Sequence, residues 1–116
     1  MSAYLAKIVY QITCGHGRHA AQFDEQLRFV FAASETEALV KSKFIGLQEE
    51  DRFFNQQQQL VSWTFVGVTE LYRLGELSDG AEVYSQIRET EDAASYISFA
   101  QHKATLLHRT NALSHL

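Results

Sequence analysis

The chain has 116 residues, of which 46% are apolar and 21% are charged, and its net charge is −4 with histidine neutral. This length and composition are typical of one globular domain and exclude wholesale disorder. Fourteen acidic residues against ten basic ones disfavour nucleic-acid binding, because nucleic-acid-binding proteins usually need a basic excess to displace counterions from phosphates. We expect a single domain over residues 1–108, followed by a frayed tail over residues 109–116 that has no clear apolar period.

Several features of the chain bear on its location. The single cysteine, Cys14, excludes an intramolecular disulfide and therefore a disulfide-stapled secreted scaffold. The first residues lack the basic segment and long apolar run of a signal peptide. No apolar run approaches the length of a membrane span. We therefore expect a cytoplasmic protein that does not contact the membrane.

The first two segments of the chain alternate between two kinds of side chain. Residues 3–12 have apolar side chains at every second position, and a period of two is typical of a strand. Residues 23–33 repeat the pattern, with Leu27, Phe29 and Phe31 on one side. The connection between them contains glycine and is longer than a usual hairpin loop, yet an antiparallel pair is its simplest outcome.

A helix is expected to begin near residue 35. Ser34 and Glu37 form a capping box, in which the Ser34 hydroxyl accepts a hydrogen bond from the Glu37 amide. Gly46 predicts a weak point or a bend in this helix. We interpret residues 55–59, which are rich in glutamine, as a polar loop. The predicted apolar face of the helix consists of Leu39, Val40, Phe44, Leu47 and Phe54.

The second half of the chain predicts two more strands and a helix. Residues 60–74 are apolar on both sides around Gly67, which indicates a central strand with a bulge. Asp79-Gly80 is a strong turn signal and leads into a strand at residues 82–87. Thr90 is expected to cap the last helix, because acidic residues follow it in the first turn.

These elements define an α+β fold with the order β-β-α-β-β-α. The sheet has four strands and is mainly antiparallel, and we expect both helices to pack on one of its faces. The other face would then be open and aromatic, and an exposed apolar patch usually marks an interface or a ligand groove. The candidate interface residues are Tyr4, Tyr10, Trp63, Phe65, Tyr72 and Tyr84.

This open face favours an interaction module over an enzyme. We expect a homo-oligomer, most simply a dimer, that associates through its sheet or through a strand edge. A further protein or a small molecule is a possible partner, whereas a membrane or a nucleic acid is not expected. The sequence singles out no catalytic residue.

The connection after the first strand contains residues that often bind metals. Cys14, His16 and His19 are the candidate metal ligands, because thiolate and imidazole bind zinc well. Their spacing matches no standard zinc motif, so we favour a solvated loop and expect no metal or other cofactor. The alternative function is a small-molecule-binding protein, or a small enzyme, with a pocket between sheet and helices that uses these three residues.

Other chemical interpretations each lack a necessary partner. The Gly15–Arg18 segment has flexible amides and a positive charge for a phosphate, but the Walker lysine is missing. Cys14 as a nucleophile would need an oriented base. Trp63 and Phe65 suit base stacking, but no basic groove accompanies them. The acidic run at residues 49–51 is typical of a solvated helix segment.

Four segments of the chain match a known pattern: Lys7–Tyr10, Ser34–Ala38, Val61–Val68 and Leu77–Ser85. The most distinctive parts are the Trp-x-Phe-x-Gly-Val strand and the Asp-Gly-x-Glu-Val-Tyr turn. Together they resemble a bacterial family catalogued as domain of unknown function 4288, over roughly residues 4–87. The resemblance implies a bacterial origin and an uncharacterised role, and it brings no known active site.

Overall fold

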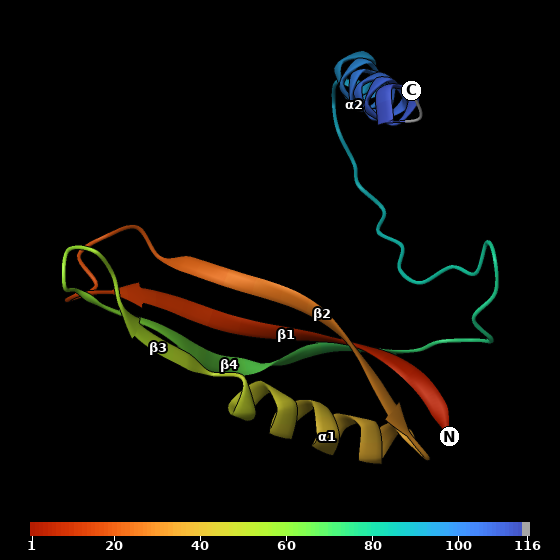
Figure 1. Cartoon of the computed structure of the whole chain (residues 1–116). Helices are drawn as coiled ribbons and strands as arrows, with labels where there is room; N and C mark the ends of the chain where they lie inside the picture. The colour runs from red at the N-terminus through yellow and green to blue at the C-terminus, as the bar shows by residue number, and fades with distance from the viewer. Residues whose placement is uncertain (115–116) are drawn as a thin grey trace. The chain divides into compact units, whose positions relative to one another are not determined.

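The computed structural model describes residues 1–114 and contains six elements in the order β-β-α-β-β-α (Figure 1). The elements are β1 (Ser2–Cys14), β2 (Gln22–Ala32), α1 (Glu35–Gln48), β3 (Asp51–Phe54), β4 (Leu60–Arg73) and α2 (Ala93–Ser114). The strands form one sheet in the order β2-β1-β4-β3, and all neighbours are antiparallel. The α+β class and the element order are therefore confirmed.

One strand lies elsewhere than predicted. Residues 82–87 do not form a strand, although the preceding turn forms as expected, with Gly80 at a φ of 86° and a 3.0 Å hydrogen bond from the Ala81 amide to the Ser78 carbonyl. The fourth strand is instead β3, in a segment that we assigned to the end of the first helix. Because β4 has β1 on one side and β3 on the other, it offers no position for residues 82–87.

The glutamine-rich segment is the turn of the β3–β4 hairpin. The side-chain oxygen of Asn55 accepts hydrogen bonds from the amides of Gln57 and Gln59, both at 2.9 Å. Gln58 adopts a positive φ of 62°. An asparagine that binds the backbone two residues further on starts a turn. The loop prediction is thus confirmed, and the turn explains why the chain reverses here and adds a strand.

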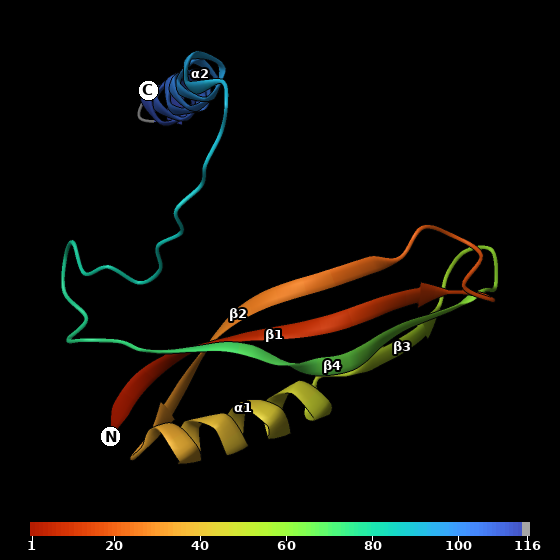
Figure 2. The same cartoon turned by 180° about the vertical axis from the view of Figure 1, so that it is seen from behind.

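The contacts divide the chain into two compact units, Met1–Val83 and Tyr84–Leu116. The sheet and α1 belong to the first unit, in which α1 lies along one face of the sheet (Figure 2). The single domain over residues 1–108 and the packing of both helices on one face stay predictions. Neither helix within residues 1–114 has the length and apolar character needed to cross a membrane.

The second unit contains α2. The Asp92 carboxylate accepts hydrogen bonds from the amide and the hydroxyl of Ser95 at 3.0 and 2.6 Å. Asp92 therefore caps this helix, and the predicted cap, Thr90, instead accepts a hydrogen bond from the Asp92 amide. The predicted frayed tail belongs to α2 as far as Ser114, and residues 115–116 lie outside the described residues.

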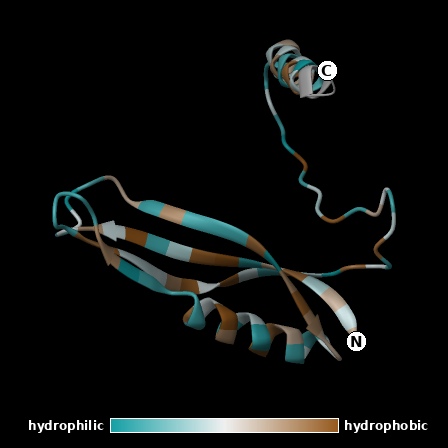
Figure 3. Ribbon diagram, viewed as in Figure 1, coloured by the Kyte–Doolittle hydropathy of each residue, from teal (hydrophilic) through white to brown (hydrophobic). Residues whose placement is uncertain are grey.

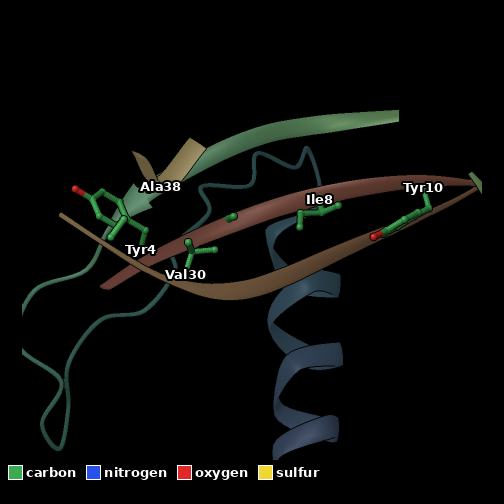
Figure 4. Close-up of a cluster of buried hydrophobic side chains, with 7 residues drawn as sticks. Tyr4, Ile8, Tyr10, Val30 and Ala38 are labelled. Carbon is green, nitrogen blue, oxygen red and sulfur yellow. The ribbon is translucent and has the colours of Figure 1, made fainter. Parts of the chain in front are cut away.

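The core of the first unit lies between the sheet and α1. Figure 4 shows its side chains, with Tyr4, Ile8, Tyr10, Val30 and Ala38 labelled. The buried members of this core are Tyr4, Ala6, Ile8 and Tyr10 of β1, Val30 and Ala32 of β2, and Ala38 of α1. Alternate residues of β1 point to this side, as the period of two predicted. The Tyr10 hydroxyl donates a 2.8 Å hydrogen bond to the Gly46 carbonyl, which satisfies one of the last carbonyls of α1.

The helix α1 faces the sheet with small residues, so its predicted apolar face was wrong. Ala38, Ser42 and Gly46 are buried and lie four residues apart on one side of the helix. A Cβ atom at position 46 would overlap the Phe65 ring, so the glycine permits close packing of the helix on the sheet. The large rings on the sheet occupy the space that larger helix side chains would need.

Candidate interaction surface

The face of the sheet opposite α1, here called the open face, carries a row of exposed apolar side chains on β2. This β2 row consists of Phe23, Leu27, Phe29 and Phe31, whose exposed fractions are 55%, 46%, 53% and 56%. Val30 of the same strand points into the core, so its odd-numbered neighbours point away from α1. Figure 3 shows the alternation of hydrophobic and hydrophilic residues along β2.

The centre of the open face is already shielded by the sheet itself. Leu5 lies between Phe29 of β2 and Tyr72 of β4 in the two ladders, and only 3% of it is exposed. Val9 is 8% exposed. The apolar surface that meets water on this face therefore lies mainly on β2, with Tyr72 of β4 39% exposed as well.

Three charged side chains form a triad in the middle of the open face. The Lys7 ammonium lies 3.8 Å from the Glu25 carboxylate of β2 and 3.5 Å from the Glu70 carboxylate of β4. A partner that covered the whole face would bury this triad, and the desolvation of three charges is costly. A partner that approaches from the β2 side avoids most of that cost.

Three of the predicted interface residues lie on the covered face of the sheet. Tyr4 and Tyr10 are only 3% and 1% exposed and belong to the core beneath α1. Phe65 packs on the same core, with its ring centroid 6.2 Å from that of Tyr10 in an edge-to-face arrangement. These three residues stabilise the fold of the isolated chain.

The other three candidates have different surroundings. Trp63 stacks on Phe53 with centroids 5.9 Å apart, and its indole N–H donates a 3.0 Å hydrogen bond to Asp24. Tyr72 lies on the open face with 39% exposed, and Tyr84 is 37% exposed and belongs to the second unit. The β2 row was missing from the predicted interface, although the alternation of β2 was visible, because the sequence did not show which face α1 covers.

A second exposed row lies on the side of α1 that points away from the sheet. This outer α1 row consists of Val40, Phe44 and Leu47, which are 63%, 65% and 57% exposed. The spacing i, i+4, i+7 places the three side chains on one side of the helix, opposite the buried small residues.

In the connection between β1 and β2, His19 holds the loop together. Its Nε2 atom accepts a 3.0 Å hydrogen bond from the Cys14 amide, and its Nδ1 atom lies 2.8 Å from the Ala20 carbonyl, to which it donates in the matching tautomer. Both ring nitrogens therefore bind the backbone, and a metal would have to displace one of these bonds. The Cys14 thiol lies 3.4 Å from the Gln59 side-chain oxygen.

A pocket adjoins this connection. It is lined by Cys14, His16, Arg18, His19, Gln22 and Gln59. It therefore lies at the end of the sheet, and the helix α1 contributes nothing to its lining. Within residues 1–114, His, Cys, Asp and Glu side chains form no cluster of three that could hold a metal ion.

Comparison with known proteins identifies the family. The model of the family described as domain of unknown function (DUF4288) matches residues 3–85. The chain belongs to this family. The DUF4288 match spans α1 and all of the sheet except Ser2, and it includes both the β2 row and the outer α1 row. No curated protein and no solved structure matches the chain.

Two pKa shifts in the DUF4288 domain follow from its packing. Burial raises the pKa of the Tyr10 phenol above its usual value of 10.0. Hydrogen bonds from the Ala33 amide and from Lys41 lower the pKa of Glu37 below 4.5. Tyr10 binds the last turn of α1 and Glu37 binds the backbone just before its start, so both shifts follow from contacts at the ends of this helix.

Proposed function

We propose that this DUF4288 domain is a non-enzymatic interaction module that forms a homodimer through its sheet. The observation that carries the proposal is the β2 row, in which four large apolar side chains are each about half exposed on the face that α1 leaves uncovered. Burial of such surface is favourable by about 25 cal/mol per Å². A contact that buried most of this row would therefore be a substantial source of binding free energy.

The polar side chains of the first unit support a binding role over catalysis. His19 binds the backbone at both nitrogens, and the Glu50 carboxylate accepts a 2.8 Å hydrogen bond from the Phe65 amide. Asp24 accepts hydrogen bonds from Gln26 and Trp63. Each of these potential acid–base groups is engaged in holding the fold, whereas a general acid or base must reach a substrate.

Light scattering coupled to size-exclusion chromatography tests the proposal. The wild-type chain should elute as a dimer at micromolar concentration, and Phe29→Glu should make it monomeric, because a charge would then lie in the buried row. The matched control is Phe44→Glu, which places the same charge at another largely exposed phenylalanine, on α1, and should leave the dimer intact. A monomeric wild type, or a dimer lost only in Phe44→Glu, would contradict the proposal.

The alternative function places a small ligand or a metal in the pocket beside the β1–β2 connection. The observation in its favour is that Cys14, His16 and Arg18 line one pocket. Calorimetric titration of zinc into untagged protein tests the metal version. One saturable site that is lost in His16→Ala would favour the alternative, and the absence of saturable heat would count against it.

A further inference from the structure

We propose that the two copies pair through the outer edges of their β2 strands, antiparallel and around a twofold axis at Gln26. The two four-stranded sheets would then form one continuous sheet. This inference rests on the proposed homodimer and adds the strand, the direction and the register of the contact.

The two edges of the sheet differ in the protection they carry. Exposed edge strands of monomeric proteins are usually short, bulged, or guarded by lysine or proline. β3 is four residues long and begins with the charged pair Asp51 and Arg52. β2 is eleven residues long, contains neither lysine nor proline, and keeps an unbroken register with β1 from Ser2↔Ala32 to Ile12↔Gln22. Its outer edge is therefore a long and regular template for another strand.

The side of β2 that faces α1 carries a self-complementary ladder of polar residues. Gln26 donates a 2.7 Å hydrogen bond to Asp24 and accepts a 2.9 Å hydrogen bond from Arg28. Along the strand, Asp24 is negative, Gln26 is neutral and Arg28 is positive. A second strand related by a twofold axis at Gln26 runs in the opposite direction, so that each Asp24 lies opposite the Arg28 of the second copy. Opposite charges in directly facing positions stabilise a strand pair.

The same register also pairs the aromatic residues of the open face. Phe23 of each copy lies opposite Phe29 of the other, and aromatic cross-strand pairs are favourable. A register centred on Arg28 would instead place two arginines against each other. The Phe31 carbonyl already accepts a 2.7 Å hydrogen bond from Lys41, and the register centred on Gln26 leaves this residue outside the pairing.

Edge pairing also fits the distribution of exposed surface on the open face. A twofold axis normal to the sheet keeps both open faces on the same side, so the two β2 rows would lie next to each other and shield each other laterally. The same register places Glu25 opposite Leu27 of the second copy, at the seam. Lys7 and Glu70 lie on β1 and β4, away from the seam, so the cost of removing these two charges from water is avoided. A face-to-face dimer would bury the whole triad.

A charge-swap experiment on the full chain tests the register. Asp24→Arg alone should raise the dimer dissociation constant about tenfold or more, because two like-charge pairs would face each other across the seam. The double variant Asp24→Arg/Arg28→Asp should restore most of the affinity, since it re-creates the opposite-charge pairs. The control Asp51→Arg makes the same change at the β3 edge and should leave the dissociation constant unchanged. Circular dichroism reports whether each variant is folded.

The outcomes separate this inference from the proposed function. A monomeric wild type overturns both. A wild-type dimer that is insensitive to Asp24→Arg, or a double variant that does not recover, overturns the β2 pairing and leaves the homodimer standing.

Amide hydrogen exchange gives a second readout that does not depend on any variant. Dimerisation should protect every second amide of residues 22–30, because those amides point to the new strand. Protection of residues 82–87 together with β2 would assign the edge to that segment and overturn the inference.

Discussion

The two faces of the sheet are built by the same strands, yet they have different environments. On the covered face, Tyr10 and Phe65 pack against the small residues of α1, and Tyr10 is almost fully buried. On the open face, Phe29 is equally aromatic but half exposed. Both faces carry aromatic side chains at alternate positions of the strands, so the sequence pattern does not distinguish them. The position of α1 decides which of these side chains stabilise the fold and which remain available to a partner.

The largest effect that distinguishes the two faces is expected from truncation of one ring on each. Tyr10→Ala should lower the free energy of unfolding by about 3–5 kcal/mol, because it leaves a cavity beneath α1. Phe29→Ala should change it by less than about 1 kcal/mol in dilute monomer, because the side chain is largely exposed there. Urea unfolding followed by circular dichroism measures both values. Similar losses for the two variants would mean that the open face is part of the core.

The close approach of α1 to the covered face gives the next largest effect. Gly46→Ala should destabilise the domain by about 1–3 kcal/mol, because the added methyl overlaps the Phe65 ring and forces repacking. Helix propensity alone would favour the substitution by about 1 kcal/mol. Gly67→Ala is the control, since a Cβ atom there has no other heavy atom within 4 Å among the described residues. A stabilised Gly46→Ala variant would contradict the packing of α1.

A smaller effect is expected from the hydroxyl of Tyr10. Tyr10→Phe should cost about 1 kcal/mol at neutral pH, because it removes the hydrogen bond to the Gly46 carbonyl. Burial raises the pKa of this phenol in the folded state, so its contribution is complete below the unfolded pKa and is lost as the pH rises through the folded pKa. Wild-type stability should therefore fall above about pH 10, and part of that fall should be absent in Tyr10→Phe. Unfolding curves at a series of pH values test this difference.

The smallest effect concerns the start of α1. Hydrogen bonds lower the pKa of Glu37 in the folded state, so its contribution is present above the unfolded pKa and is lost as the pH falls through the folded pKa. Glu37→Gln should therefore flatten the acid side of the stability profile slightly. Unchanged acid dependence in Glu37→Gln would show that the hydrogen bond to the Ala33 amide contributes nothing in solution.

The alternating strands and the start of the first helix were predictable, because local patterns determine them. The period of two located β1, β2 and β4, and the capping box located the start of α1, with a 3.1 Å hydrogen bond from the Glu37 amide to the Ser34 hydroxyl. β3 was missed because it is only four residues long and the Asn55 turn makes it part of a hairpin.

The face of α1 and the exposed surface depend on tertiary packing. Hydrophobicity favoured Val40 and Phe44 as core residues, but the side of α1 that meets the rings of Tyr10 and Phe65 carries the small residues Ser42 and Gly46. The sequence predicted that one face of the sheet would be open. Which strand residues lie on that face depends on the position of α1, which local patterns do not determine.

The molar mass of the wild-type chain in solution tests the central claim most directly. A second copy should shield part of the β2 row, so light scattering at micromolar concentration should give twice the chain mass of 13.2 kDa. A single species of 13.2 kDa under the same conditions would contradict the account of the open face.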